Sequence, residues 1–174
     1  MKLVVNLKLL PSPYQHRALF QTLEMANAAG NFASGVVWEQ QTFGQFKLHK
    51  LVYRDIRERF SLTAQVAVRV IAKVADAYKL DRKSQRTFNP HGSIAYDDRI
   101  LRYLKDDRVS IWTMKGRQTI PYACGARQRD LLVAQWLVQA EMLRQAGQFE
   151  LAEAHYQRVL KYDAANPRAR AGLA

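Results

Sequence analysis

Cysteine is almost absent from this chain, and its scarcity excludes several kinds of site. Cys124 is the single cysteine, so the chain has no disulfide of its own and no zinc site built from cysteine pairs. A reducing compartment is the natural expectation. The histidines offer no substitute, because no pair has metal-ligand spacing. They are His16, His49, His91 and His155.

Long apolar runs and glycine-rich phosphate loops are also missing. The stretch MKLVVNLKLLPSPYQ at the start alternates in polarity and is interrupted by Asn6 and Lys8, so it predicts neither a signal peptide nor a membrane span. Neither the P-loop nor the Rossmann glycine pattern occurs. We therefore expect a soluble, cytoplasmic protein with no membrane contact, no cofactor and no metal.

Acidic residues are scarce relative to basic ones. The 174 residues include 27 Lys and Arg but 15 Asp and Glu, which gives a formal net charge of +12. Residues 1–130 hold 22 basic and 11 acidic side chains, whereas residues 131–174 hold 5 and 4. An excess of this size favours a polyanionic partner, and here it belongs to the first three quarters of the chain.

The chain opens with strand-like and helix-starting signals. KLVVNLKLL, at residues 2–10, is rich in residues that favour strands. Pro11 and Pro13 end this strand, and Ser12 is a suitable cap for a helix that follows.

Apolar residues at helical spacing then predict three helices, at about 14–41, 47–60 and 61–80. In the second helix we expect Leu51 to face the core together with its apolar neighbours. In the third, Gln65, Arg69 and Lys73 are spaced four residues apart and share one face.

After residue 92 the apolar period changes to two, which predicts short strands at SIAY, RILRYL, RVSIWTM and RQTIPYA. Paired carboxylates could hold a divalent metal, but Asp97–Asp98 and Asp106–Asp107 stand where turns are expected, and aspartate is common in turns. The predicted fold is α+β: a small antiparallel β-barrel or meander with a three-helix insertion at about 12–85, plus a C-terminal helical hairpin at 131–174.

No group of residues predicts catalysis. Cys124 has no histidine near it in sequence and is interpreted as a small buried filler. We therefore expect a protein that is not an enzyme.

Basic and aromatic residues instead predict a nucleic-acid surface, because Lys and Arg neutralise phosphates and tyrosine stacks on unpaired bases. We expect the arginines of the second helix to lie close to a basic loop at 82–86. A solvated charged face is the alternative. The candidate nucleic-acid-binding residues are Arg54, Arg57, Gln65, Arg69, Lys73, Arg82, Lys83, Arg86, Tyr96 and Arg99.

The first 130 residues resemble the N-terminal portion of the TnpB-like (OrfB) transposon-associated proteins, which are RNA-guided DNA nucleases. The resemblance is carried by LLPSPYQ, NAAGNFASGVV and QVAVRVIAKVADAYK in this order, followed by the return to strands. It implies a wedge β-barrel with a helical recognition insertion that holds guide RNA and reads DNA. It also implies that Gln65, Arg69 and Lys73 face the nucleic acid, with Tyr96 and Asp97 beside them.

Two features depart from that family. Tyr14 stands where the family usually has a small polar or acidic residue. The RuvC-like carboxylates and the zinc ribbon of the nuclease half are not found in this chain, so the resemblance implies a truncated, catalytically inactive relative.

Residues 133–166 resemble one tetratricopeptide repeat. The match rests on residues whose sizes suit two closely crossing helices, with a glycine at the turn between them. They are Trp136, Ala140, Gly147, Phe149, Ala152 and Tyr156. Gln139 and Ala164 depart from the repeat pattern, PRARAGLA resembles the opening of a second, incomplete repeat, and a generic helical hairpin is the alternative.

One repeat cannot bury its own apolar face, so this tail predicts packing on the basic domain, on a second copy or on a protein partner. Three functions stay open: a nucleic-acid-binding module, a helical-repeat interaction module, and a chimeric remnant of a mobile element with no selected activity.

Overall fold

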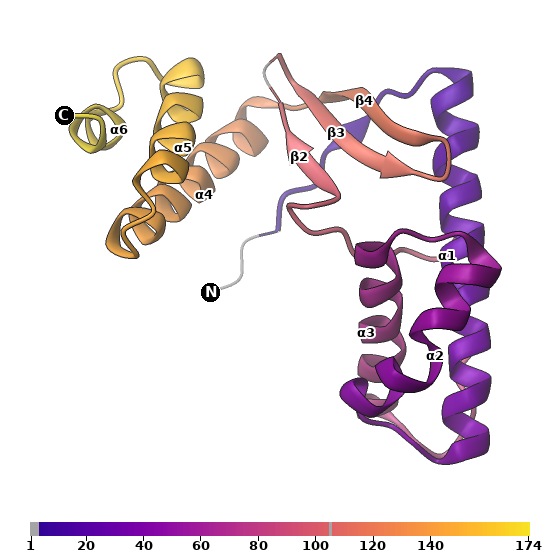
Figure 1. Ribbon diagram of the computed structural model, residues 1–174. Coiled ribbons are helices and arrows are strands. Elements are labelled where there is room, and N and C mark those ends of the chain that lie inside the picture. The colour runs from indigo at the N-terminus through magenta and orange to yellow at the C-terminus, as the bar shows by residue number, and fades with distance from the viewer. Residues whose placement is uncertain (1–3, 105) are drawn as a thin grey trace. The chain divides into compact units, whose positions relative to one another are not determined.

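A computed structural model describes residues 4–104 and 106–174, which contain six helices and four short strands. In chain order these are β1 (Lys8–Leu9), α1 (Pro13–Gln40), α2 (Gln45–Phe60), α3 (Ala64–Leu80), β2 (Leu101–Tyr103), β3 (Arg108–Thr113), β4 (Gly116–Ala123), α4 (Ala126–Gln145), α5 (Phe149–Tyr162) and α6 (Pro167–Gly172). The protein is thus of mixed helix and sheet, with three helices inserted after the first strand (Figure 1).

The described residues fall into two compact units. The helical unit comprises residues 11–104 and 108–120, and the terminal unit comprises residues 4–10, 106–107 and 121–174. Strand β4 passes from the first unit into the second. These units divide the chain differently from the 130/131 boundary, and that domain boundary stays a prediction.

The strands form one open antiparallel sheet in the order β1-β4-β3-β2. The last three strands make the predicted meander, and β1 joins it beside β4. The predicted barrel is wrong, because closure needs β1 to pair with β2 and the sheet is not closed. The two edge strands contribute only two and three residues, which is too little to close a barrel.

Three predicted strands are absent or shorter than expected, and one of them, RILRYL at 99–104, reduces to β2 at Leu101–Tyr103. The predicted strand at 2–10 reduces to Lys8–Leu9 within the described residues, and the part of it at 2–3 lies outside them. SIAY, at 93–96, forms no strand, although Ile94 and Tyr96 pack on the core as the period-two pattern requires. The backbone carbonyl of Ser93 accepts a hydrogen bond from Lys73 instead of from a neighbouring strand.

A capping box fixes the start of α1, as the sequence predicts. The Gln15 backbone N–H donates to Ser12 Oγ at 3.3 Å, and the Ser12 backbone N–H donates to Gln15 Oε1 at 3.0 Å. These contacts satisfy two donors, and Pro13 supplies the favoured backbone angle of the first helical position.

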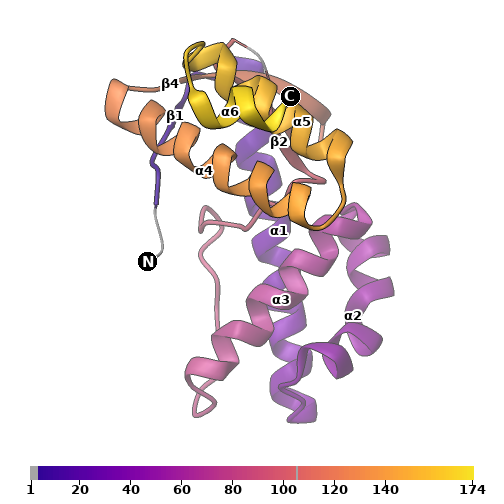
Figure 2. The same ribbon diagram turned by 90° about the vertical axis from the view of Figure 1, so that its left-hand side faces the viewer.

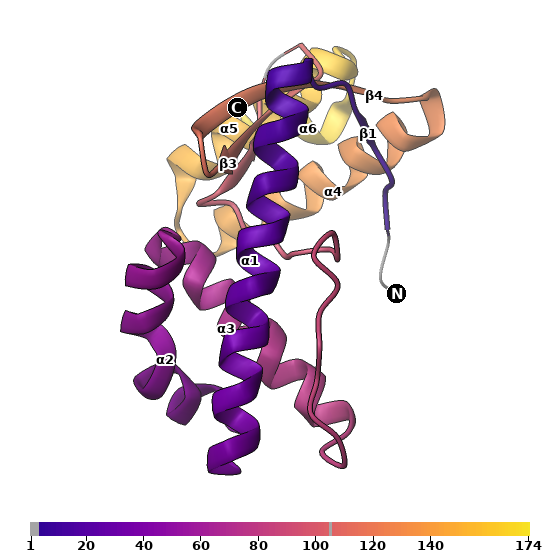
Figure 3. The ribbon, with the colours of Figure 1, turned by 90° about the vertical axis from the view of Figure 1, so that its right-hand side faces the viewer.

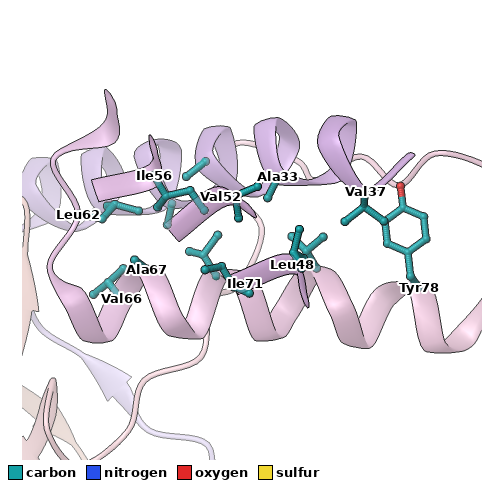
Figure 4. Close-up of a cluster of buried hydrophobic side chains, with 14 of the residues drawn as sticks. Ala33, Val37, Leu48, Val52, Ile56, Leu62, Val66, Ala67, Ile71 and Tyr78 are labelled. Atoms are coloured by element: carbon teal, nitrogen blue, oxygen red, sulfur yellow. The ribbon is translucent and has the colours of Figure 1, made fainter. Parts of the chain in front are cut away.

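Helices α1, α2 and α3 pack around one hydrophobic core (Figure 4). Helix α2 contributes Leu48, Val52 and Ile56, all fully buried at positions i, i+4 and i+8. Figure 4 shows Ile56 near Leu62 and Val66 at one end of this core, and Leu48 near Val37 and Tyr78 at the other. Helix α2 therefore runs antiparallel to α3, with its C-terminal end beside the start of α3.

Polar residues of α1 hold the return segment, which we define as residues 81–97 between α3 and β2 (Figure 3). Asn31 exchanges two hydrogen bonds with the Phe88 backbone, at 3.0 and 2.7 Å. Ser34 Oγ donates to the carbonyl of Arg86 at 2.5 Å. A Cβ at Gly30 would lie 3.2 Å from the Phe88 ring, so the NAAGNFASG stretch combines amides that bind this segment with a glycine that lets it approach.

In the terminal unit, α4 and α5 pack as a hairpin and α6 packs on both (Figure 2). Trp136, Ala140, Ala152 and Tyr156 are buried, and Gly147 makes the turn with a φ of 73°. Phe149 is exposed. The helical hairpin is thus present, whereas its identity as a tetratricopeptide repeat stays a prediction.

Among the helices of the described residues, none is both long enough and apolar enough to cross a bilayer.

Candidate nucleic-acid interface

The side of α2 opposite its buried stripe is rich in basic and aromatic side chains. Because Leu48, Val52 and Ile56 fix which side faces the core, the helical period places a second set on the outside. We call this set, which has the half-buried His49 and Tyr53 at its edge, the α2 outer face: Phe46, Lys47, His49, Lys50, Tyr53, Arg54 and Arg57.

The cations of the α2 outer face are largely available to a ligand. Within the described residues, no carboxylate lies in ion-pair distance of Lys47 or Lys50. Arg54 Nε lies 3.9 Å from Glu58 Oε1, and the Arg54 side chain is 85% exposed. An ion pair this long and exposed is weak, so a phosphate can displace it.

The rings of the α2 outer face form two preorganised groups. The His49 and Tyr53 rings stack with centroids 4.5 Å apart and planes inclined by 19°, and Arg57 donates to the Tyr53 hydroxyl at 3.2 Å. One turn earlier, Lys50 Nζ lies 4.7 Å from the centroid of the Phe46 ring. Each group thus combines an aromatic surface with a cation that can contact phosphate.

The predicted α3 stripe forms, but two of its members bind the return segment. Lys73 Nζ donates to Asn27 Oδ1 at 2.6 Å and to the Ser93 carbonyl at 2.8 Å, and burial lowers the pKa of Lys73. Gln65 Nε2 donates to Asp97 Oδ2. The predicted proximity of Gln65 and Asp97 is therefore present, but it places a carboxylate where a phosphate would have to sit.

Arg69, between these two on α3, is different. Its Nε is enclosed and has no hydrogen-bond partner in the described part of the chain. Arg69 is therefore a half-buried member of the stripe with one side-chain donor unpaired among the described residues.

Tyr96 and Arg99 lie in and just after the return segment. The Tyr96 hydroxyl donates to the Trp112 carbonyl at 3.2 Å, and burial raises the pKa of Tyr96 to about 12. Arg99 is exposed, and its NH1 donates to Gln65 Oε1 at 3.0 Å. Tyr96 therefore acts mainly in packing, whereas Arg99 remains accessible.

The raised pKa of Tyr96 predicts a loss of stability in alkali that Tyr96→Phe removes. The unfolded chain ionises this hydroxyl near its ordinary pKa of about 10, while the folded chain keeps it protonated up to about 12. The contribution of the protonated Tyr96 hydroxyl to the free energy of unfolding is complete below pH 10, and it is lost as the pH rises through 12. Urea unfolding at pH about 9 and about 11 should show a smaller decrease for Tyr96→Phe than for the unaltered chain. Tyr14→Phe, at an exposed tyrosine, is the control, and equal decreases in both variants would contradict this cause.

Arg82, Lys83 and Arg86 follow the end of α3. Arg82 lies 5.1 Å from the Phe43 ring centroid, and Arg86 pairs with Asp81 and donates to its carbonyl. Lys83 is exposed, and its backbone N–H donates to Asp81 Oδ1 at 2.7 Å. Arg86 thus stabilises the turn, while Lys83 is accessible.

The expected proximity of this loop to Arg54 and Arg57 is wrong. Helix α2 is antiparallel to α3, so the end of α3 lies beside the start of α2, where Phe43 and Tyr78 rings are 5.3 Å apart. Arg57 is twelve residues beyond Gln45, which is about 18 Å along a helix. The two basic groups therefore lie at opposite ends of the three-helix core.

Five residues of the α2 outer face were not among the predicted site residues: Phe46, Lys47, His49, Lys50 and Tyr53. The signal was present in QFKLHKLVYR, because the helical period places Phe46 and Lys50 opposite Leu48 and Val52. Leu51, expected in the core, is 42% exposed for the same reason.

The aspartate pair at 106–107 and Cys124 were the other groups with possible chemistry. Asp106 and Asp107 occupy left-handed turn conformations with φ of 63° and 50°. In the described residues, no group of three His, Cys, Asp or Glu side chains could hold a metal ion. Cys124 is half-buried rather than buried, and its Sγ lies 3.6 Å from the Gly125 carbonyl.

Comparisons with family models, curated proteins and solved structures give no match for this chain. The TnpB-like and tetratricopeptide resemblances therefore stay predictions.

Proposed function

We propose that this protein is a nucleic-acid-binding module and that the α2 outer face is its principal contact surface. The observation that carries the proposal is the accessibility of four cations on one face of one helix: Lys47, Lys50, Arg54 and Arg57. Phosphate contacts of this kind supply most of the affinity of sequence-independent binding. The module has no catalytic role in this proposal.

The net charge of +12 supports the same partner, because a polyanion is attracted to the whole chain before it contacts the helix. Lys83 and Arg99 extend the accessible charge beyond α2, and Arg69 adds a half-buried guanidinium with one unpaired donor among the described residues. The TnpB-like resemblance suggests guide RNA or target DNA as the polymer.

The test is the salt dependence of binding by the full chain. Fluorescence anisotropy with a labelled oligonucleotide should show log Kd rising linearly with log salt concentration, with a slope of about 3 if four phosphates of a single strand are neutralised. Binding that does not change with salt, or no binding, would overturn the proposal.

A second candidate function, self-association through the terminal unit, is favoured by exposed apolar side chains. Phe149 is 67% exposed, and it lines a hollow of about 320 Å³ together with Leu173, Arg144 and Glu153. Because this surface carries both signs of charge, two copies can face each other with Arg144 of one near Glu153 of the other. Residues 131–174 are also nearly neutral, so two copies repel each other least here.

Sedimentation velocity over a range of concentrations tests this second function. The unaltered chain should dimerise, and Phe149→Glu should abolish the dimer by placing a charge in the contact. Leu80→Glu is the control, because it introduces the same negative charge at an exposed apolar residue of the helical unit. It should leave the dimer intact. A monomer at every concentration, or equal loss in both variants, would contradict it.

A further inference from the structure

Phe46 has an exposure that packing does not explain. Its side chain is at the start of α2, and the residue is 75% exposed, although burial of a phenylalanine ring is one of the largest single contributions to stability. The core-facing position two residues later is already occupied by Leu48, which is fully buried. The ring therefore stands beside the cations of the α2 outer face without contributing to the core.

The neighbouring groups limit what this ring can bind. Lys50 Nζ lies 4.7 Å from its centroid, and Lys47 follows it directly in sequence. A purely apolar partner would have to desolvate both ammonium groups, which is costly. A ligand with a flat apolar face and a nearby negative charge can stack on the ring and pair with both ammonium groups at the same time.

Unpaired nucleotides have this combination, whereas paired ones do not. In a duplex the base faces are covered by the stack, so a protein ring reaches them only by opening it. In a single strand each base offers a free face next to its phosphate. The stacked pair of His49 and Tyr53, with Arg57 bonded to the Tyr53 hydroxyl, repeats the same pairing of ring and cation farther along the helix.

We infer that the α2 outer face selects single-stranded nucleic acid, with an unpaired base stacked on Phe46 and its phosphates on Lys47 and Lys50. This inference rests on the proposed function and adds the class of polymer and the contact that recognises it. Selection by stacking is tolerant of sequence, because every base has a π-face.

The experiment compares three probes of equal length, about 10 nucleotides, which lies within common single-strand site sizes. They are oligothymidylate, an abasic strand with the same phosphates, and a duplex. The full chain should bind oligothymidylate about 5- to 100-fold more tightly than the abasic strand, the factor expected for one stacked base. It should also bind oligothymidylate more tightly than the duplex.

Phe46→Ala should remove most of the difference between oligothymidylate and the abasic strand. Leu51→Ala, at an exposed apolar residue of the same helix, is the matched control and should change neither affinity. Because both side chains are exposed, both variants should fold normally.

The outcomes separate the inference from the proposed function. Equal affinity for oligothymidylate and the abasic strand, or tighter binding of the duplex, overturns single-strand selection but leaves phosphate binding intact. Loss of preference in Leu51→Ala to the same extent as in Phe46→Ala overturns the role of the ring. Absence of binding to all three probes defeats the proposed function itself.

Discussion

Neutralising the four cations of the α2 outer face should weaken oligonucleotide binding by about 200-fold at physiological salt. The variant carries Lys47→Gln, Lys50→Gln, Arg54→Gln and Arg57→Gln. Each cation that contacts a phosphate releases counterions, and this release contributes a factor of about 4 per contact at such salt. The slope of log Kd against log salt should also decrease by about 3 in magnitude, since a single strand gives about 0.7 per phosphate. Anisotropy titrations at several salt concentrations measure both quantities.

A matched control distinguishes a local site from general charge attraction. Arg127, Arg144, Arg168 and Arg170 are exposed and lie in the terminal unit, so changing all four to Gln alters the net charge equally. This control should weaken binding only several-fold, through the long-range field. If both variants weaken binding equally, the polyanion is attracted to the whole chain and the α2 outer face is not its site.

Asn27→Ala should be the most destabilising single polar substitution in the helical unit, at about 3 kcal/mol. Asn27 is buried, and its Nδ2 lies within hydrogen-bond distance of the carbonyls of Leu23, Pro90 and Gly92, at 2.9, 3.0 and 2.8 Å. Its Oδ1 accepts from Lys73 Nζ at 2.6 Å. Truncation leaves a half-buried ammonium and several carbonyls without this partner, and such groups are costly once removed from water.

The same substitution one helical turn later is the control. Asn31 also bonds the return segment, at the Phe88 backbone, but its contacts are exposed, so water replaces them when the amide is lost. We expect Asn31→Ala to cost about 1 kcal/mol. Urea unfolding followed by circular dichroism measures both, and equal losses would show that burial of Asn27 contributes little.

The helices were predictable because their apolar spacing is strong and local. The expected helix at 47–60 corresponds to α2 at Gln45–Phe60, and the one at 61–80 to α3 at Ala64–Leu80. The start of α1 was also predictable, since Ser12, Pro13 and Gln15 act on one another within four residues.

The sheet was less predictable because alternation of apolar and polar residues indicates which side chains are buried. It does not indicate which strands pair with one another. Ile94 and Tyr96 alternate toward the core as strand residues do, yet their backbone follows α1 and α3 and has no partner strand. The closure of the predicted barrel depended on pairing between β1 and β2, which are about ninety residues apart. Nothing in a local pattern determines such pairing.

The candidate site was also only partly predictable, because local patterns do not determine contacts between residues far apart in the sequence. The spacing of Gln65, Arg69 and Lys73 correctly predicts a shared face of α3. It could not reveal that Asn27 Oδ1 and the Ser93 carbonyl, 46 and 20 residues from Lys73, accept hydrogen bonds from its ammonium group. Charge and spacing therefore identified basic residues, but their internal partners decide which of them remain accessible to a ligand.

The most direct test of the central claim is an amide chemical-shift titration of the full chain with a short single-stranded oligonucleotide. If the α2 outer face binds the strand, the largest shift changes should occur for residues 46–57, with smaller ones at Arg69 and Arg99. Changes confined to residues 126–174, or spread evenly over every basic residue, would contradict the assignment of nucleic-acid binding to α2.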